Sequence, residues 1–317
     1  MLDSRDVWIV DVAPRDGLQN DPGRLSTQEK IELILGLFRA GIYRVEIGSF
    51  VNPEKVPTMA DVEAVAQGLP AQLLARSTAL VPNERGYDRA LRVGLKDLRF
   101  VVAVSSTMHR KNFNREPEDT LRELQDILGR PSSQAIKVGV VLATAFGCPY
   151  EGLINPEAVR DLALKVADLG VSEVLLADTT GMAAPLQVGR LAETLLSDLS
   201  SYRLQLGLHL HNTRNLGYAN AYAGWSAGIR LFDASLGGIG GCPFAPQAMG
   251  NIATEDLVGM FEGMRVTTGV HLGSLLSLSG WLGERLGHPL PSLLPKAGPV
   301  PWLREGTPSV PQVEQQQ

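Results

Sequence analysis

The stretch Pro156–Ala177, PEAVRDLALKVADLGVSEVLLA, contains one helix-to-strand unit of the chain. Asn155 is suited to cap a helix that begins at Pro156, and Gly170 follows its last turn, where glycine commonly ends a helix. The next run, Glu173–Ala177, is almost continuously apolar, which is typical of a strand covered on both faces. The stretch therefore predicts a helix that leads into a buried parallel strand.

The same unit recurs along the chain. Short apolar runs predict eight strands, at Val7–Val12, Arg44–Ile47, Gln72–Ser77, Asp97–Val104, Ile136–Thr144, Glu173–Ala177, Arg203–His211 and Gly228–Ala234. Amphipathic segments predict helices after them, at Thr27–Ala40, Met59–Gly68, Glu84–Val93, Glu116–Leu128, Pro156–Leu169, Pro185–Leu199, Leu216–Ala227 and Thr254–Met264. This alternation predicts an α/β fold, a (β/α)8 TIM barrel, with His271–Arg285 as a C-terminal helical extension. A doubly wound sheet alternates in the same way, but no G-x-G-x-x-G motif opens the first helix, and the number of units fits a closed barrel better.

The bulk properties of the chain narrow its class. Residues 1–288 are predicted to form the barrel domain with its extra helix. The proline-rich residues 289–317 are expected to form a poorly ordered tail, or an arm on a neighbouring subunit. The formal net charge of −5 offers no basic surface for nucleic acid. Two cysteines, no signal-peptide pattern and no membrane-length apolar run lead us to expect a cytoplasmic protein without a nucleic-acid or membrane partner.

Polar residues gather where the predicted strands end. Such ends form the functional face of a TIM barrel, so their side chains are expected to meet there. They come from five of the eight strands, and are Arg15, Asp16, Glu46, Ser49, Asp178, His209, His211 and Asp233, followed by Cys242 and Asn251 in and after a glycine-rich loop.

The pattern His209-Leu-His211 is the sharpest local signal. Residues i and i+2 of a strand point to the same side, so both imidazoles can chelate one ion, although two hydrogen-bonded structural histidines would show the same pattern. Asp16 and Asn251 could each simply cap a helix. Taken together, two nitrogen and two oxygen ligands predict a site for Mg²⁺ or Mn²⁺ rather than for a structural zinc.

Two further residues suit acid–base or charge chemistry. Arg15 could stabilise a developing enolate oxygen, or form a salt bridge to Glu46 or Asp178. Cys242 lies among glycines that make a mobile lid plausible, where its thiol could donate a proton once the loop closes. Cys148 is expected to pack in the interior.

The segment His109-Arg-Lys111-Asn112 follows the fourth predicted strand. Lys111 and Asn112 could bind a phosphate or the pantetheine of an acyl-CoA, and a solvated loop is the simpler alternative. His271 and His288 fall outside the predicted barrel mouth and receive no role.

Several motifs, in this order and spacing, resemble the 3-hydroxy-3-methylglutaryl-CoA lyase family of metal-dependent barrel lyases over about residues 7–271. They are Asp11–Asn20 (DVAPRDGLQN), Glu46–Pro53 (EIGSFVNP), Val56–Asp61 (VPTMAD), Gly147–Gly152 (GCPYEG), Asp178–Gly181 (DTTG), His209–His211, Gly240–Pro243 (GGCP) and Asn251–Asp256 (NIATED). The resemblance implies metal-dependent cleavage of a 3-hydroxy-3-substituted acyl-CoA to acetyl-CoA and a keto acid, which is acetoacetate if the substrate is 3-hydroxy-3-methylglutaryl-CoA. It also implies a homodimer.

The resemblance assigns roles to individual residues. Asp16, His209, His211 and Asn251 are implied as ligands of Mg²⁺ or Mn²⁺. Arg15 is implied as the cation that stabilises the enolate, and Cys242 as the acid on the loop. Glu46 and Asp178 are implied as carboxylates near the metal that handle protons. His209 and Asp16 are the candidates for the base, and Asp178 is a candidate to assist either of them.

Two segments depart from the family pattern. Asn212-Thr-Arg214-Asn215 stands where the family has Asp-Thr-Tyr-Gly, and Pro246, Gln247 and Met249 alter the glycine-rich loop. We therefore expect an intact metal site and an altered acyl pocket. The alternatives are an acyl-CoA lyase with a different 3-substituent, a pyruvate-type aldolase or synthase of the same superfamily, which would not need the Cys242 thiol, and a non-catalytic metal-binding homologue.

Overall fold

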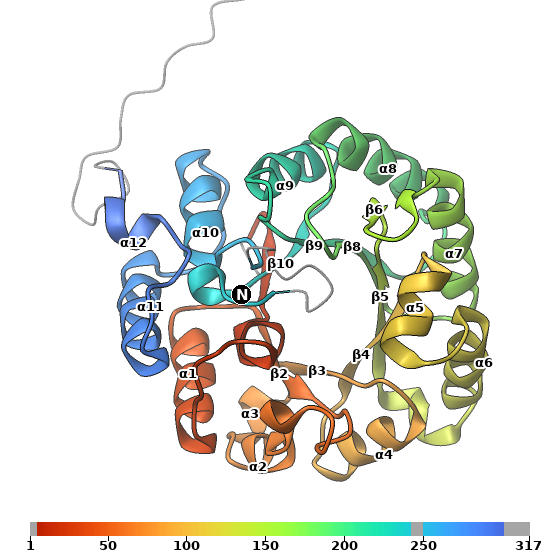
Figure 1. Cartoon of the computed structure of the whole chain (residues 1–317), viewed down its shortest axis with the longest axis horizontal. Coiled ribbons are helices and arrows are strands. Elements are labelled where there is room, and N and C mark those ends of the chain that lie inside the picture. The colour runs from red at the N-terminus through yellow and green to blue at the C-terminus, as the bar shows by residue number, and fades with distance from the viewer. Residues whose placement is uncertain (1–4, 242–249, 301–317) are drawn as a thin grey trace, which may run out of the picture.

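The computed structural model describes residues 5–241 and 250–300. Within them, eight parallel strands close a barrel in the order β1-β10-β9-β8-β5-β4-β3-β2, which confirms the predicted TIM barrel, and helices surround it (Figure 1). The barrel strands are β1 (Trp8–Asp11), β2 (Arg44–Ser49), β3 (Ser77–Leu80), β4 (Asp97–Ala103), β5 (Lys137–Ala143), β8 (Glu173–Asp178), β9 (Gln205–Leu210) and β10 (Leu231–Ala234).

The helices alternate with these strands. They are α1 (Thr27–Arg39), α2 (Val62–Gln67), α3 (Ala71–Leu74), α4 (Glu84–Arg92), α5 (Ser106–Phe113), α6 (Pro117–Leu128), α7 (Pro156–Asp168), α8 (Pro185–Asp198), α9 (Gly217–Ser226), α10 (Thr254–Gly263), α11 (Leu272–Leu286) and α12 (Leu294–Ala297). Short helical turns lie at Ala13–Gly17, Pro57–Met59, Pro131–Ala135 and Leu236–Gly238, and β6 (Gly147–Cys148) pairs with β7 (Gly152–Leu153). The described residues contain no helix long and apolar enough to cross a membrane.

Local sequence explains several helix starts. The Ser26 hydroxyl accepts from the Glu29 backbone N–H, and the Glu29 carboxylate accepts from the Ser26 N–H, which is a capping box at the start of α1. The Asn155 side chain accepts from the Glu157 N–H at 3.0 Å and caps α7, as predicted. These caps begin the helices that pack against the barrel.

Two predicted elements were wrong. Gln72–Ser77 was expected to be the third strand, but Ala71–Leu74 is the short helix α3, and the strand runs later, at Ser77–Leu80. The run AQLL consists of good helix formers, and Pro70 pre-sets the turn before it. The segment after β4 is helix α5 rather than a loop, and the Ser105 hydroxyl caps it by accepting from the Met108 N–H at 3.0 Å.

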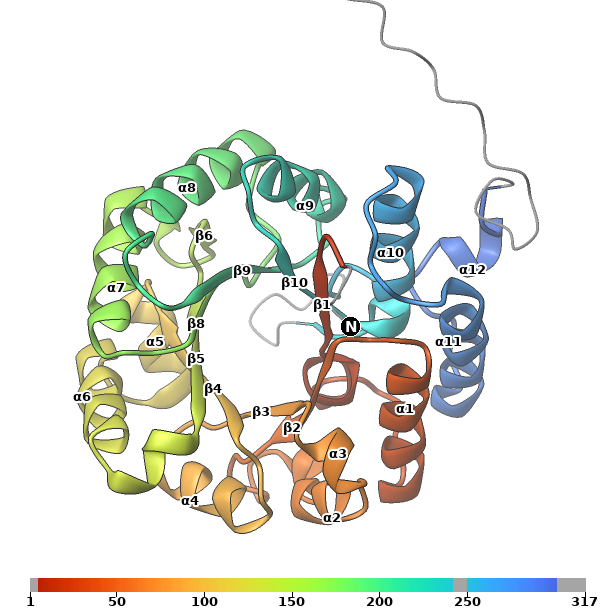
Figure 2. The same cartoon turned by 180° about the vertical axis from the view of Figure 1, so that it is seen from behind.

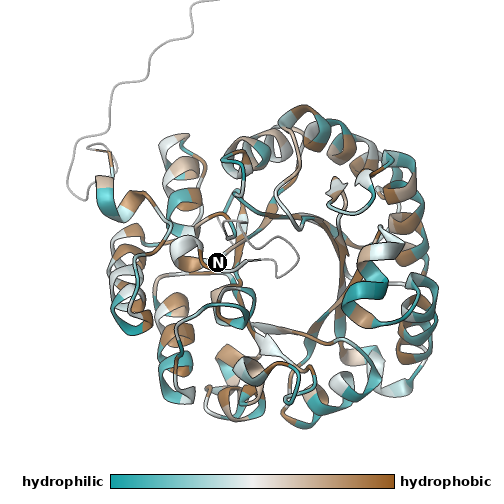
Figure 3. Ribbon diagram, in the orientation of Figure 1, coloured by the Kyte–Doolittle hydropathy of each residue, from teal (hydrophilic) through white to brown (hydrophobic). Residues whose placement is uncertain are grey.

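The core has an apolar layer outside the strands and a mixed layer inside the barrel. Most strand residues are coloured hydrophobic in Figure 3, and the surrounding helices carry the hydrophilic residues. Inside the barrel, Val10, Val12 and Leu231 form a small separate apolar cluster. Arg99, Glu173 and Asp233 are also buried there, so charged groups occupy part of the interior.

The chain beyond the barrel packs on one side of it. Seen from either side, α11 and α12 lie outside the ring, beside α10 (Figure 2). The first part of the predicted tail belongs to this packed region, because Leu290 and Ser292 are buried and the Asp256 carboxylate accepts the backbone N–H groups of Leu293 and Leu294. The rest of the predicted tail, 301–317, lies outside the described residues.

Candidate metal and substrate site

Three of the predicted metal ligands meet at the mouth of the barrel. Asp16 lies in the turn directly after β1, His209 lies in β9, and His211 follows the end of β9. The Nε2 atoms of His209 and His211 are 3.3 Å apart, and the Asp16 Oδ2 atom lies 3.8 and 3.9 Å from them. Among the described residues, this is the one group of histidine and acidic side chains found that could hold a metal ion.

The spacing of these three atoms fits a divalent cation. A triangle with edges of 3.3, 3.8 and 3.9 Å has a centre about 2.1 Å from each corner, which matches the ligand distance of Mg²⁺. The donors are two imidazole nitrogens and one carboxylate oxygen, a mixed set that suits such ions. The residues present therefore fit a divalent metal.

Asn251, the fourth predicted ligand, lies against this group. An isolated β-bridge joins it to His211, and its Nδ2 atom donates to Asp16 Oδ2 at 2.8 Å and to the Ile239 carbonyl at 3.2 Å. A Cβ atom added to Gly240 would lie 2.6 Å from that Nδ2 atom, and the φ of Gly240 is +109°. Only glycine lets the loop pass so close to Asn251.

Burial and the neighbouring charges set the pKa values of Asp16 and His211, and with them the protonation states that a metal ion would meet. Burial opposes ionisation of Asp16, but Arg15, His209 and His211 outweigh it and lower its pKa to about 2. Burial and the neighbouring His209 lower the pKa of His211 to about 4. Asp16 is therefore ionised and His211 is neutral near pH 7, which are the forms that bind metal.

His209 is oriented by a buried carboxylate. Its Nδ1 atom lies 3.1 Å from Asp233 Oδ2. An ionised carboxylate only accepts hydrogen bonds, so Nδ1 carries the proton between the two groups and Nε2 faces Asp16 and His211. Burial lowers the pKa of His209, but the bond to Asp233 and the charge of Asp16 outweigh it, so that its pKa is raised.

Arg15 contacts Glu46, one of the two salt-bridge partners that the sequence offered, and also lines the cavity. Its Nη1 atom contacts Asp16 Oδ1 at 2.5 Å, its Nε atom lies 3.7 Å from Glu46 Oε2, and its side chain also lines the cavity. Glu46 is buried, and this burial raises its pKa against the opposing charge of Arg15. The pair combines a fixed cation with a carboxyl group that protonates readily.

A cavity of about 330 Å³ opens above these groups. Its polar lining consists of Arg15, Asp16, Gln19, Asn20, Glu46, Ser49, Asn112, Thr179, His209, His211, Asp233 and Gly241. Its apolar lining consists of Val51, Val56, Leu80, Val101, Phe113, Val141, Ala143 and Ala177. The buried Ser49 Oγ and Gln19 Oε1 atoms have no hydrogen-bond partner among the described residues, so both are available to a bound molecule.

Asp178 lies beside the cavity rather than in its lining. Its two oxygens accept the N–H groups of Met182 at 2.7 Å and Ala183 at 3.1 Å. Burial raises its pKa to about 6 in spite of these bonds. In this arrangement its carboxylate holds the loop after β8.

The two predicted cofactor-binding residues lie at the end of α5. Asn112 lines the cavity, and the Lys111 ammonium lies 4.8 Å from the centre of the Tyr150 ring at the rim. Cys148 is buried, as predicted. Cys242, Pro246, Gln247 and Met249 lie outside the described residues.

Asn212 and Arg214, which also depart from the family pattern, bond backbone groups after β8 and at the start of α9. The Asn212 Oδ1 atom accepts the Gly217 N–H at 3.1 Å, at the start of α9. Arg214 donates to the carbonyls of Thr180 at 3.1 Å and Gly181 at 2.8 Å. Neither side chain lines the cavity.

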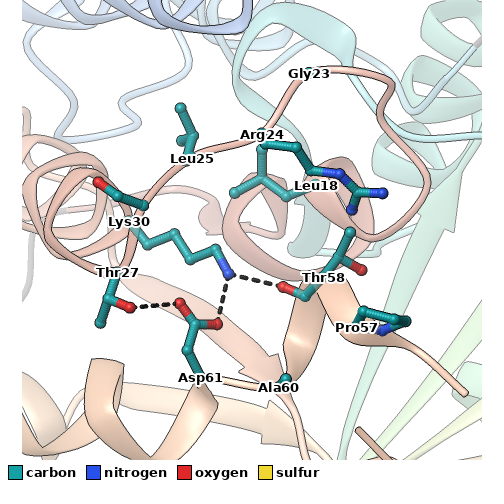
Figure 4. Close-up of a pocket in the computed structure, with 11 residues that line it drawn as sticks. Leu18, Gly23, Arg24, Leu25, Thr27, Lys30, Pro57, Thr58, Ala60 and Asp61 are labelled. Atoms are coloured by element: carbon teal, nitrogen blue, oxygen red, sulfur yellow. Dashed lines mark hydrogen bonds and ion pairs between the residues drawn. The ribbon is translucent and has the colours of Figure 1, made fainter. Parts of the chain in front are cut away.

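A second hollow, of about 600 Å³, lies outside the barrel mouth beside the start of α1 (Figure 4). The buried Lys30 ammonium donates to the Thr58 carbonyl at 2.7 Å and to Asp61 at 2.6 Å, while Thr27 donates to the other oxygen of Asp61 at 2.8 Å. Thr58 donates in turn to the Gln19 carbonyl at 3.0 Å. Lys30 therefore braces the loop after β1, which carries Arg15 and Asp16, and the loop after β2, the strand that carries Glu46.

Sequence reasoning missed one charged residue behind the site. Arg99 is fully buried in β4 and pairs with Glu173 and Asp233. The available signal was an arginine in the middle of the otherwise apolar run DLRFVVA.

Comparisons with known proteins agree with this geometry. The HMGL-like family model matches residues 6–281. The (R)-citramalyl-CoA lyase of Chloroflexus aurantiacus is 50% identical over 93% of this chain and 95% of its own length. A hydroxymethylglutaryl-CoA lyase of Bacillus subtilis is 41% identical over 90% of this chain and 95% of its own.

Solved structures give the same result. An HMG-CoA lyase from Acenitobacter baumannii, solved in complex with coenzyme A and 3-methylmalate, has a TM-score of 0.88 and 39% identity, and the match covers 98% of this chain and 100% of that one. The chain therefore belongs to the HMGL-like family, and it is a carbon–carbon lyase.

Proposed function

We propose that this lyase cleaves a 3-hydroxy-3-methyl acyl-CoA that carries a carboxylate near C3, and releases acetyl-CoA and a keto acid. The observation that carries the proposal is that Asp16, His209, His211 and Arg15 line one cavity together with a set of apolar residues. The polar lining suits the hydroxyl and carboxylate, and the apolar lining suits the methyl group and the acyl chain.

We propose (R)-citramalyl-CoA as the preferred substrate, with acetyl-CoA and pyruvate as products. The support is the relative of that name, which shares 50% identity over nearly the whole chain. 3-Hydroxy-3-methylglutaryl-CoA is the second candidate, because several similar proteins bear that name. The two substrates differ by one methylene between C3 and the carboxylate, and the second would release acetoacetate instead of pyruvate.

The proposed metal is Mg²⁺ or Mn²⁺, held by Asp16, His209, His211 and Asn251. When bound, such a cation polarises oxygen ligands and lowers the pKa of a hydroxyl group. Glu46 lines the cavity with a raised pKa, so we propose that it takes part in moving the hydroxyl proton. As the C2–C3 bond breaks, its electron pair moves to the thioester oxygen, where Arg15 stabilises the enolate.

The last step is protonation of C2, and we propose that the Cys242 thiol supplies this proton. Gly241, its neighbour in the chain, lines the cavity. Lys111 and Asn112 are proposed to bind the coenzyme A portion at the rim, where Asn112 lines the cavity and Lys111 lies over Tyr150. The homodimer and the cytoplasmic location stay predictions from the sequence.

The test is a substrate panel with the full chain. The protein is treated with chelator, reloaded with Mn²⁺ or Mg²⁺, and incubated with (R)-citramalyl-CoA, (S)-citramalyl-CoA, 3-hydroxy-3-methylglutaryl-CoA and a free 4-hydroxy-2-keto acid. Acetyl-CoA and the keto acid are measured by mass spectrometry. We expect metal-dependent release of pyruvate from (R)-citramalyl-CoA to be fastest. Fastest release of acetoacetate would replace the proposed substrate, and cleavage of free keto acids but of no thioester would support an aldolase instead.

A further inference from the structure

A buried arginine lies directly beneath the floor of the cavity. Arg99 and Val101 are two residues apart in β4, so their side chains point to the same side of the strand, and Val101 lines the cavity. The Arg99 side chain is only 1% exposed. Its charge is balanced inside the barrel, because Nη1 donates to both oxygens of Asp233, at 3.0 and 2.9 Å, and Nε donates to Glu173 at 2.9 Å.

The same Asp233 contacts the proposed metal site. Its Oδ2 atom accepts from His209 Nδ1 at 3.1 Å while Arg99 holds both of its oxygens. A buried carboxylate that lost the group holding it would turn, and the turn would alter its bond to the imidazole. The Arg99 Nη1 atom bonds both carboxylate oxygens and so keeps the carboxylate from turning.

We propose that Arg99 is a positioning residue for the metal site. It fixes the Asp233 carboxylate, which holds His209 with its Nδ1 atom protonated and its Nε2 atom directed at Asp16 and His211. The inference rests on the proposed role of His209 as a metal ligand. It extends the site inward by Asp233, which lines the cavity, and by Arg99, which does not. Among the described residues, no hydrogen bond or ion pair joins either of them to Asp16 or His211.

The barrel interior is built to accommodate this arginine. Gly139 in β5 is paired in register with both Arg99 and Glu173. A Cβ atom at Gly139 would lie 3.2 Å from Glu173 Oε1 and 3.5 Å from Arg99 Cγ, so a larger residue would press on the ion pair. Gly139, which is paired with Arg99, therefore leaves the space that the arginine side chain needs.

A second interior arginine provides a matched control. Arg44 in β2 binds the other oxygen of Glu173 and contacts Asp97 at 2.8 Å. It is also well shielded from water. Its charge helps to lower the pKa of Asp233, but no hydrogen bond or ion pair joins it to Asp233 or His209 among the described residues. Replacing Arg44 disturbs the same ion cluster without breaking the connection to the metal site.

The experiment measures equilibrium Mn²⁺ binding by calorimetry for the parent chain, Arg99→Met, Arg99→Lys and Arg44→Met. Loss of groups that orient a metal ligand typically weakens metal binding roughly 10- to 100-fold, and we expect this range for Arg99→Met. Arg99→Lys keeps the charge and should recover part of the affinity. Arg44→Met should bind Mn²⁺ within about twofold of the parent, although both methionine variants unfold at lower temperature.

A second measurement reports on His209 directly. The chain has five histidines, so ¹⁵N-histidine labelling gives few signals, and the metal-free protein should show His209 protonated at Nδ1. We expect this state to be lost in Arg99→Met and kept in Arg44→Met. If Arg99→Met does not fold, Asp233→Asn and Arg99→Lys decide the question through the same two readouts.

The outcomes separate this inference from the proposed function. A folded Arg99→Met variant with parental Mn²⁺ affinity and an unchanged His209 tautomer overturns the positioning role and leaves the lyase proposal intact. A parent chain that binds no Mn²⁺, or binds it equally well after Asp16→Ala, overturns the proposed metal site itself.

Discussion

At the scale of single residues, Arg15 carries the clearest chemical expectation. Its guanidinium lines the cavity and is held between Asp16 and Glu46, where it can stabilise negative charge on the enolate oxygen. Arg15→Met should lower kcat about 100- to 1,000-fold, as removal of an oxyanion donor does elsewhere. Steady-state kinetics measure the effect, and Arg24→Met, which removes an exposed arginine from the next loop, serves as the control. A variant with parental kcat would remove Arg15 from the proposed mechanism.

His109 is predicted to make stability depend on pH. Its Nδ1 atom accepts the Ala103 N–H at 3.1 Å and Nε2 lies 2.9 Å from the Thr120 hydroxyl, so the ring is neutral. Burial, aided by the charge of Arg115, lowers its pKa from 6.5 to about 4. As the pH falls below 6.5 the unfolded chain binds a proton that the folded chain resists, so stability present at pH 7 is progressively lost toward pH 4.

The measurement is urea unfolding of the parent and His109→Gln at pH 7 and pH 5. The parent should lose on the order of 1–2 kcal/mol more than the variant between these values, because glutamine does not titrate. Other carboxyl groups titrate in both proteins, so the difference between the two reports on His109. Equal losses would contradict the assignment.

At the scale of elements, the loops that follow β1 and β2 are held together by one lysine. Lys30 in α1 contacts Thr58 and Asp61 (Figure 4). The Thr58 hydroxyl in turn donates to the Gln19 carbonyl. Lys30→Met should lower the free energy of unfolding by about 1–3 kcal/mol, because a largely buried carboxylate and a carbonyl lose their donor. Chemical denaturation measures this, with the exposed Lys55→Met as the matched control. The variant should also raise KM if the brace positions the cavity wall.

Prediction from sequence succeeded for most elements and failed where local patterns were ambiguous. The αβ unit at Pro156–Ala177 has a cap, a helical period and a continuous apolar strand, and it was confirmed. Gln72–Ser77 is short and apolar, which fits a helix or a strand equally well by periodicity. His109–Asn112 is polar and was expected in a loop, but packing of His109 against Thr120 places it within α5.

At the scale of the whole molecule, metal binding should stabilise the fold. The proposed ligands come from the turn after β1, from β9 and from the segment after β10, and β1 and β9 both pair with β10. A cation bound only by the folded barrel would contribute about 2.7 kcal/mol at a free concentration 100 times its Kd. Calorimetric scans should therefore show a Tm that rises with Mn²⁺ concentration.

Two histidine variants test this stabilisation. His211→Ala removes a proposed ligand and should abolish the rise in Tm. His288→Ala removes a histidine bound to Asp21 outside the site, and should retain the rise from a lower starting Tm. A rise of the same size in both variants would show that Mn²⁺ binds elsewhere.

The sequence by itself determined the barrel and the face on which its chemistry lies. Alternating apolar strands and amphipathic helices are local patterns, and the His209-x-His211 spacing places both rings on one side of a strand whatever surrounds it. The spatial grouping of Asp16, His209 and His211 follows from these local patterns once the barrel closes.

Only the tertiary structure decided which buried side chains inside the barrel support its functional face. Arg99 lies 74 positions from Glu173 and 134 positions from Asp233 in the chain, so no local pattern indicates that they meet. The closed barrel brings them together and excludes water. In that environment an unpaired charge is costly, and each group therefore depends on the others.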